Sequence, residues 1–436
     1  MNNLLQKEFK FINIIYLVKE LIKEWGEDGL IWLDGDNSHE GKLIKIGTNP
    51  IKQYCCRDTD INVNPFNLLE NLGPGHWTGW LAYEAASWIE KSVDWKPSEM
   101  ATMWIASHDP IIKIDLRKKI LRVEGLNQKS FSSMCQWISS LKEKRYEEDN
   151  RSISLPINSW EWDTSQDEFS ENVIKIKRLI AQGDIFQANL TTGCSTKINE
   201  YISPIDLYLQ LKKRSPAPFS GVIIGNGEAK GESIISTSPE RFLKVSTQGY
   251  VETRPIKGTR PRNNKINIDA DMAIELLTSQ KDRAENIMIV DLLRNDLGRV
   301  CIPGTVQTPL LLNLESYANV HHLTSVIRGK LKDRKTWVDL LYASWPGGSI
   351  SGAPKVRACQ RLQELEKQPR GPYCGSIINI DWDGSFDSNI LIRSLFMKDK
   401  ILRAHAGCGI VADSNPSNEA EEMKWKLLPI LKALEN

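Results

Sequence analysis

Apolar residues recur every three to four positions in several stretches of the chain, and this spacing predicts amphipathic helices. The first such helix is expected at residues 14–25, where Gly26 follows the last apolar position and would end it. Further helices are expected at residues 167–182, 269–277 and 282–297. The longest of them carries both apolar and acidic positions, so it is a candidate for a functional helix.

Other stretches alternate between apolar and polar residues or form short apolar runs, which is typical of β-strands. We expect strands at residues 30–33, 43–46, 185–194, 219–224, 233–236 and 241–245. Residues 79–84 mix aromatic and small residues in the manner of a buried strand that runs into a helix. Helices and strands alternate in irregular order, and many of the strands are expected to be antiparallel. The pattern therefore favours an α+β fold over a doubly wound parallel sheet.

One charged run interrupts this pattern. Between residues 141 and 159 the sequence K-E-K-R-Y-E-E-D-N-R-S contains too few apolar residues to pack against a core. It is the best candidate for a linker, and it predicts a boundary near residue 155. The expected organisation is an N-terminal α+β region at 1–155 and a second domain at 156–436. The length of 436 residues also permits one large interleaved fold.

Composition excludes several classes of partner. Lysine and arginine total 56 against 55 aspartates and glutamates, so no strong net charge attracts the chain to nucleic acid or to a membrane surface. The eight cysteines show no C-x-x-C spacing, which is typical of reduced thiols. The first ten residues lack the apolar core of a signal peptide, and no run of eighteen apolar residues follows. We expect a cytoplasmic protein that acts on a small molecule.

The first candidate for chemistry is the sequence R-P-I-K-G-T-R-P-R at residues 254–262. Lys257 is predicted to stand on a short turn, with Pro255 fixing the backbone before it and Gly258 allowing close approach after it. A free lysine, with a pKa of about 10.4, is protonated at neutral pH, so a nucleophilic role requires burial or a nearby cation. The alternative is a surface lysine among three arginines.

Two acidic helix faces form the second candidate. Asp282 and Glu285 are three residues apart, and Glu419, Glu422 and Lys426 fall on one side of a C-terminal helix. If the two faces meet, the carboxylates repel one another unless a cation lies between them. Oxygen ligands without histidine or cysteine favour a hard metal, and Mg²⁺ suits a site that also binds an anion. The alternative is two solvated faces with local ion pairs.

Two glycine-rich segments are candidates for anion binding. The sequence W-P-G-G-S-I-S-G-A-P-K at 345–355 places Pro354 at an expected first helical position, which leaves backbone amides free to meet a carboxylate. It is not a P-loop, because it lacks Gly-Lys-Ser/Thr in direct succession. The second segment, H-A-G-C-G-I-V at 405–411, is predicted to be a turn. Arg393 is predicted to lie in a strand, paired with either an anionic substrate or an internal carboxylate.

Taken together, these segments resemble the chorismate-utilising enzymes, which include anthranilate, aminodeoxychorismate, isochorismate and salicylate synthases. The resemblance covers about residues 165–430 and rests on these motifs in one order: G-D-I-F-Q-A-N-L, S-P-E-R-F-L, R-P-I-K-G-T-R-P-R, D-R-A-E-N-I-M-I-V-D-L-L-R-N-D-L-G-R-V, H-H-L-T-S-V-I-R-G, G-G-S-I-S-G-A-P-K, and A-G-C-G-I-V followed by E-x-x-E-x-x-x-K. It implies a large interleaved sandwich of mostly antiparallel β-sheets with outer helices.

The resemblance also implies roles for individual residues. Glu285 and Glu422 would bind Mg²⁺ directly, with Asp282 and Glu419 in support through water. Three residues would be catalytic: the nucleophile Lys257, the general acid Glu240 and His322, which lines the pocket of the substrate ring. The residues expected to contact chorismate, most of them through its carboxylates, are Gln187, Gly258, Thr259, Ser349, Tyr373, Arg393, Gly407, Cys408, Gly409 and Lys426.

Two positions bear on which member of the family the chain resembles. Isochorismate and salicylate synthases carry a lysine that activates water where this chain has Gln187, so attack by water at C2 is not expected. Anthranilate synthases typically have P-I-A-G-T, whereas P-I-K-G-T with Lys257 is similar to aminodeoxychorismate synthases. By this resemblance Lys257 attacks C2 as the C4 hydroxyl departs, and ammonia then adds at C4. Mg²⁺ and the neighbouring arginines would favour the neutral amine that this requires.

The resemblance implies a source of ammonia outside this chain. The sequence has no G-x-C-x-G nucleophile turn, so a separate glutamine amidotransferase subunit is the expected partner. The product would be 4-amino-4-deoxychorismate, for p-aminobenzoate and folate biosynthesis. The alternatives are an anthranilate synthase large subunit and a catalytically silent chorismate-binding subunit.

Overall fold

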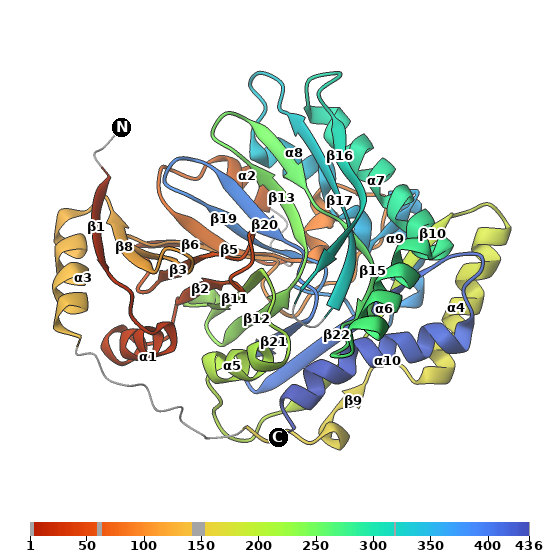
Figure 1. Cartoon of the computed structure of the whole chain (residues 1–436), viewed down its shortest axis with the longest axis horizontal. Helices are drawn as coiled ribbons and strands as arrows, with labels where there is room; N and C mark the ends of the chain where they lie inside the picture. Colours follow the sequence, from red (N-terminus) through yellow and green to blue (C-terminus); the bar gives the residue numbers. More distant parts are fainter. Residues whose placement is uncertain (1–3, 59–62, 142–152, 318–319, 436) are drawn as a thin grey trace.

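Two large antiparallel β-sheets form the centre of the computed structural model, which describes residues 4–58, 63–141, 153–317 and 320–435 (Figure 1). In the described residues the larger sheet has twelve strands, in the order β1 (Leu5–Lys10), β8 (Ile120–Gly125), β7 (Ile111–Asp115), β3 (Leu43–Gly47), β2 (Ile31–Asp34), β11 (Phe219–Ile224), β12 (Glu232–Ser238), β21 (Ser394–Lys398), β22 (Ile401–Ile410), β10 (Gln187–Lys197) and β18 (Gly352–Ala353), with β9 (Glu161–Trp162) also beside β10.

The second sheet has ten strands within the same residues. Its order is β15 (Ile256–Pro261), β17 (Val320–Lys330), β14 (Tyr250–Thr253), β13 (Arg241–Val245), β20 (Phe386–Asn389), β19 (Ser376–Ile380), β5 (Trp77–Leu81), β6 (Met103–Ser107) and β4 (Lys52–Cys56), with β16 (Gln307–Ser316) also beside β17. The architecture confirms the expected α+β fold of interleaved antiparallel sheets.

Central strands of the larger sheet, such as β11 and β12, are buried on both faces. Side chains alternate along a strand, so neighbours in sequence enter different cores. Ile223 and Ile234 pack between the two sheets, whereas Val222 and Ile235 pack against the outer helices. The sheets therefore form a sandwich with a second, helix-covered core outside it.

The helices cover the outer faces of this sandwich (Figure 1). Their bounds are α1 (Ile14–Trp25), α2 (Pro65–Glu70), α3 (Gln128–Ser140), α4 (Gln166–Ala181), α5 (Pro204–Arg214), α6 (Ile266–Thr278), α7 (Gln280–Val300), α8 (Trp337–Ser344), α9 (Lys355–Leu365) and α10 (Pro416–Ala433). Helices α1, α3, α4, α5, α9 and α10 contribute to the core outside the larger sheet, and α2, α7 and α8 contribute to the core that includes the second sheet. Among the helices of the described residues, none is both long and apolar enough to cross a membrane.

Local capping residues set the ends of several helices. Helix α1 has the predicted bounds, begins after an Asn13 side chain that accepts the Tyr16 amide proton, and ends at Gly26 with φ of +78°. Helices α6 and α7 are each longer than predicted and are separated by Ser279 alone, which ends the first and caps the second. The acidic positions of α7 thus begin directly at its N-terminal turn.

Both sheets contain strands from each side of the predicted boundary near residue 155. In the larger sheet β2 pairs with β11, and in the second sheet β5 pairs with β19. The charged run expected to be the linker lies almost entirely at residues 142–152, outside the described residues. The boundary itself stays a prediction. In both sheets, however, strands from before residue 155 are hydrogen-bonded to strands from after it.

Candidate active site

A cavity of about 620 Å³ lies where β10, β15 and β22 approach helices α7 and α10. Every predicted site residue lines it except Gln187 and Cys408. The nucleophile, the acid, the acidic cluster and the arginine proposed from separate motifs are therefore brought into one space. This grouping excludes the alternative that each motif is an independent surface feature.

Lys257 lies in strand β15 and not on the predicted turn. The pairing of β15 with β17 is irregular between Ile256 and Thr259, and Gly258 has φ of +83° at this irregularity. The Lys257 ammonium donates a hydrogen bond to the Ser349 carbonyl oxygen at 3.1 Å. Gly258 thus provides within a strand the backbone freedom that the sequence suggested for a turn. The Lys257 side chain lines the cavity.

Ser349 connects Lys257 to the predicted general acid. Its hydroxyl donates to Glu240 Oε1 at 2.8 Å, so one residue contacts both candidate catalytic groups. Burial raises the pKa of Glu240 to about 7, although the Ser349 hydrogen bond and the charge of Lys257 act in the opposite direction. A substantial fraction of this carboxyl is therefore protonated at neutral pH, which a general acid requires.

His322 is neutral under the same conditions. Burial, together with the charge of Arg393, lowers its pKa to about 3. Its Nδ1 lies 2.9 Å from the hydroxyl of Thr259, which faces it across the β15–β17 pair. The ring thus offers the cavity a neutral hydrogen-bonding and stacking surface.

The arginines beside Lys257 are not unpaired charges, and the expectation that they favour a neutral amine stays a prediction. Each one is engaged by carboxylates. The pairs are Arg254 with Glu40 and Glu315, Arg260 with Glu275 and Asp282, and Arg262 with Asp269. Their positive charge is therefore largely compensated at close range.

Four carboxylates from α7 and α10 converge in the cavity. Three of them use one oxygen in an ion pair: Asp282 Oδ2 with Arg260 at 3.2 Å, Glu419 Oε1 with Lys281 at 3.0 Å, and Glu422 Oε1 with Lys426 at 2.8 Å. No hydrogen bond or ion pair reaches the second oxygen of these three residues, or either oxygen of Glu285, from the residues that the structure describes. Burial raises the pKa of Glu285, and the nearby Asp282 and Glu422 add to this effect.

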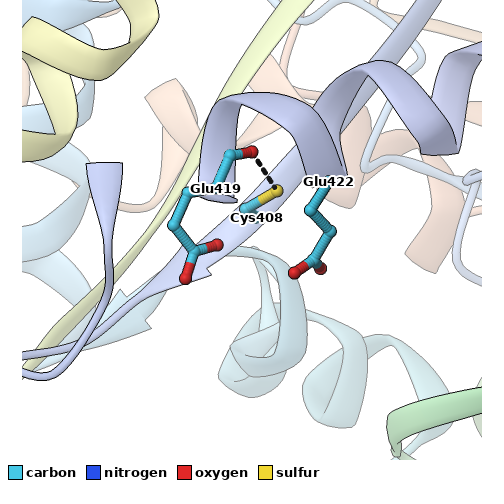
Figure 2. A group of neighbouring side chains, drawn as sticks. All are labelled: Cys408, Glu419 and Glu422. Atoms are coloured by element: carbon cyan, nitrogen blue, oxygen red, sulfur yellow. Dashed lines mark hydrogen bonds between the residues drawn. The ribbon is translucent and has the colours of Figure 1, made fainter. Parts of the chain in front are cut away.

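This donor set fits a hard divalent cation such as Mg²⁺. The thiol of Cys408 lies close to Glu419 and Glu422, with ligand atoms within 4.8 Å of one another (Figure 2). Burial raises the pKa of that thiol to about 12, however, and it donates to the Glu419 carbonyl oxygen at 3.4 Å. The neutral thiol is a poor ligand, so the available donors are carboxylate oxygens.

The segment predicted to be a glycine turn at 405–411 is part of strand β22, which corrects that prediction. Asn189 and Thr191 lie opposite Gly409 and Gly407, and their own amides donate to groups on the other side of β10, at 2.7 and 2.9 Å. Because facing residues in an antiparallel pair exchange either two hydrogen bonds or none, Gly407 and Gly409 direct their amides away from β10. Cys408 alternates with them, so its amide pairs with β10 and is not available to a carboxylate.

Arg393 lies at a bend just before β21 and not within a strand, as its φ of +51° shows. Its guanidinium faces the cavity, and no carboxylate of the described residues pairs with it. Burial without a compensating acid lowers its pKa. Of the two partners left open by the sequence, the internal carboxylate is absent from the described part of the chain, and the arginine is free to bind an anionic substrate.

Other predicted residues are placed less directly. Tyr373 lines the cavity and stacks on His405, with ring centroids 5.2 Å apart. Gln187 is buried in β10, behind the cavity wall. Its Nε2 lies 2.6 Å from the position that a Cβ atom would occupy on Gly409, so a side chain at that position would force Gln187 to shift. Pro354, expected at the first helical position, immediately precedes α9.

The cavity residues that were not proposed from the sequence include Asn189, Lys281 and His405. Each lies in a motif that was recognised for another residue. Asn189 lies within G-D-I-F-Q-A-N-L, Lys281 directly precedes D-R-A-E-N, and His405 begins H-A-G-C-G-I-V. Proximity to these motifs was the only available signal, because nothing in a one-dimensional pattern shows which face of a strand meets a cavity.

Comparison with known proteins agrees with this geometry. Residues 24–432 match the family of chorismate binding enzymes. The chain belongs to this family. The matched range includes every residue that lines the cavity.

Named relatives of this chorismate binding enzyme include more than one activity. It is 36% identical over 394 residues to an anthranilate synthase component I-like protein of Synechocystis sp., covering 88% of this chain and 78% of that protein. It is 37% identical over 336 residues to aminodeoxychorismate synthase component 1 of Salmonella typhimurium, covering 77% and 70%. Its fold is similar to that of anthranilate synthase component I from Streptococcus pneumoniae, with a TM-score of 0.78, 27% identity and coverage of 90% and 93%.

Proposed function

We propose that this chain is aminodeoxychorismate synthase component I, which converts chorismate and ammonia to 4-amino-4-deoxychorismate. The observation that carries the proposal is the placement of Lys257 in the cavity, joined through Ser349 to Glu240. Because Ser349 contacts both groups, the nucleophile Lys257 and the acid Glu240 are close enough to act on two positions of the same substrate ring. The P-I-K-G-T sequence supports the same activity.

In the proposed reaction, the Lys257 Nζ forms a bond to C2 of the ring while the C4–O bond breaks. The ring double bonds shift as the electrons move from C2 toward C4, and Glu240 donates the proton with which the hydroxyl leaves as water. Ammonia then bonds to C4, the electrons return, and the C2–N bond breaks to release the lysine. Each step keeps the balance of atoms and electrons without an oxidant or a reductant.

Binding and orientation of the substrate follow from the charges around the cavity. The unpaired Arg393 and the outward amides of Gly407 and Gly409 would hold carboxylates of chorismate. Glu285 and Glu422 would hold Mg²⁺, with Asp282 and Glu419 behind them. When bound, the cation would supply charge stabilisation to the ring carboxylate during the shift of electrons.

Ammonia is proposed to come from a separate glutamine amidotransferase subunit. The chain contains no G-x-C-x-G nucleophile turn, which supports a glutaminase activity on a separate subunit. A cytoplasmic setting is part of the proposal, and the eight free cysteines support a reducing compartment. In that setting the product would enter p-aminobenzoate and folate biosynthesis.

Product analysis tests the proposal. The purified chain is incubated with chorismate, an ammonium salt and Mg²⁺, and the products are separated by chromatography and identified by mass spectrometry. We expect 4-amino-4-deoxychorismate without release of pyruvate. Formation of anthranilate, which is fluorescent and accompanied by pyruvate, would overturn the proposal in favour of the second candidate. That candidate is anthranilate synthase component I, which is favoured by the similarity to proteins of that name.

Lys257→Ala tests the covalent step. Loss of the nucleophile should lower the rate of product formation by on the order of 10²-fold or more and remove an enzyme adduct detected by mass spectrometry of the intact protein. Lys244→Ala removes an exposed lysine from strand β13 and serves as the matched control, with unchanged rate and adduct. Full activity of Lys257→Ala would contradict the assigned role.

A further inference from the structure

Lys281 occupies a position that a lysine does not favour on local grounds. It lies in the first turn of α7, directly after the capping Ser279 and Gln280. The N-terminus of a helix carries partial positive charge and stabilises acidic side chains, so a cation there is repelled. An interaction outside the helix must therefore offset this repulsion.

That interaction is the ion pair with Glu419 from the first turn of α10. The Lys281 ammonium donates to Glu419 Oε1 at 3.0 Å, and the hydroxyl of Ser414 donates to the same oxygen at 2.7 Å. The Glu419 side chain is only 3% exposed, whereas that of Lys281 is 48% exposed. A buried carboxylate is thus neutralised by a lysine that reaches it from the solvent side.

Glu419 is part of the acidic cluster, with a carboxylate oxygen within 4.8 Å of ligand atoms of Cys408 and Glu422. Figure 2 shows the carboxylates of Glu419 and Glu422 on the same side of α10, with Cys408 between them. Without a cation, these acids and Glu285 would repel one another at close range. Lys281 supplies positive charge at the place where the cluster is most buried.

We propose that Lys281 is the resident counter-ion of the acidic cluster, which holds Glu419 in place before a divalent cation binds and opposes that binding through its own charge. The inference rests on the Mg²⁺ site of the proposed function and deepens it, because it names the residue that sets the affinity of the site for the metal.

Lys281 is better suited to this role than the other lysine of the cluster. Lys426 is fixed at two points, since its ammonium pairs with Glu422 at 2.8 Å and donates to the Gly407 carbonyl oxygen at 2.9 Å. Lys281 has Glu419 as its hydrogen-bond partner within the described residues, and half of its side chain already contacts solvent. It can therefore move toward water when a dication approaches, at little cost in other contacts.

The test measures the binding of Mg²⁺ alone, without substrate or turnover. Metal-stripped protein is titrated with Mg²⁺ in a calorimeter, and thermal unfolding is followed in EDTA and in excess Mg²⁺. We expect Lys281→Gln to bind Mg²⁺ about five- to twentyfold more tightly than the wild type, because a repelling charge near the dication is removed. Its unfolding midpoint should be lower than that of the wild type in EDTA and should rise more on addition of Mg²⁺.

Two variants separate charge from other effects. Lys281→Arg keeps the charge and should bind Mg²⁺ within about twofold of the wild type. Lys367→Gln breaks a remote ion pair with Glu168, formed by a lysine of similar exposure, and should leave Mg²⁺ affinity unchanged. Equal or weaker binding by Lys281→Gln, or tight binding by Lys281→Arg, would overturn the inference and leave the proposed function intact. If the wild type takes up no Mg²⁺, the metal site of the proposed function fails, and the inference fails with it.

Discussion

At the scale of single residues, environment divides chemically equal carboxyls into different roles. Burial raises the pKa of Glu240 to about 7 and provides a protonated acid. Glu422 is only partly buried; burial acts to raise its pKa, but the neighbouring Lys426 lowers the pKa below its usual value. Two carboxyls whose pKa values are driven apart by their surroundings can serve as acid and as cation ligand in the same cavity.

Glu84 is a further buried acid whose ionisation should affect stability. It is 1% exposed, and its Oε1 accepts the Arg370 amide proton at 2.8 Å. Burial raises its pKa to about 8. Because the folded state binds the proton more tightly than the unfolded state, the stabilising contribution is present below about pH 4.5 and is lost as pH rises toward 8, by about 1.4 kcal/mol per pH unit within that window.

We therefore predict that Glu84→Gln flattens this dependence, since the amide does not ionise. Chemical denaturation at pH 5 and pH 8 provides the measurement, and the free energy of unfolding should fall less between the two for the variant. Glu421→Gln, at an exposed position of α10, is the control and should retain the wild-type slope. An unchanged slope in Glu84→Gln would show that another group governs the pH response.

At the scale of elements, the N-terminal half of α10 determines the geometry of the proposed metal site. Its first turn begins after Asn415, whose side chain accepts the amide protons of Ser417 and Asn418 at 3.1 Å each. Glu419 and Glu422 follow within the next two turns, so fraying of this end would displace both carboxylates. The cap thus connects the local stability of a helix end to cation binding.

We predict that Asn415→Ala lowers the free energy of unfolding by about 1 kcal/mol and also weakens Mg²⁺ binding. Asn13→Ala removes the equivalent cap of α1, far from the cavity, and is the matched control. It should cost a similar amount of stability and leave Mg²⁺ affinity unchanged. Denaturant titration measures the loss of stability, and calorimetry measures Mg²⁺ affinity. Equal Mg²⁺ affinity in both variants would show that the α10 cap does not control the metal site.

The two corrections at Lys257 and at residues 405–411 have one physical cause. Glycine and proline are typical of turns, so both segments were predicted to be turns. In the structure each segment pairs with a strand distant in sequence, β17 for the first and β10 for the second. Backbone hydrogen bonds from those strands make the extended form favourable, and the small glycines allow the close approach of Gln187 and of Asp282.

At the scale of the whole molecule, the site depends on sheets that both halves of the chain build. Strand β2 lies beside β11, and β5 lies beside β19. Removal of the first 155 residues would leave β11 and β19 without these partners and would expose core residues such as Ile223 and Ile378. The residues proposed to be catalytic lie after residue 155, but the framework that holds them includes strands from before it.

We predict that a fragment of residues 156–436 does not fold cooperatively when it is expressed alone. Circular dichroism should show no sigmoidal thermal transition, whereas the full chain should show one. Co-expression with residues 1–155 should restore the transition if the two fragments reassemble both sheets. Cooperative unfolding of the isolated fragment would instead establish it as an independent domain.

The sequence by itself determined the α+β class, the positions of the main helices, and the residue types of the site, because periodicity, capping residues and motif spacing are local properties of a chain. Tertiary structure alone decided that Lys257 and the 405–411 segment are strands, that Arg393 lacks an internal partner among the described residues, and that Lys281 neutralises Glu419. These outcomes depend on contacts between residues more than a hundred positions apart in several cases, and charge compensation and strand pairing at that range leave no signature in local sequence.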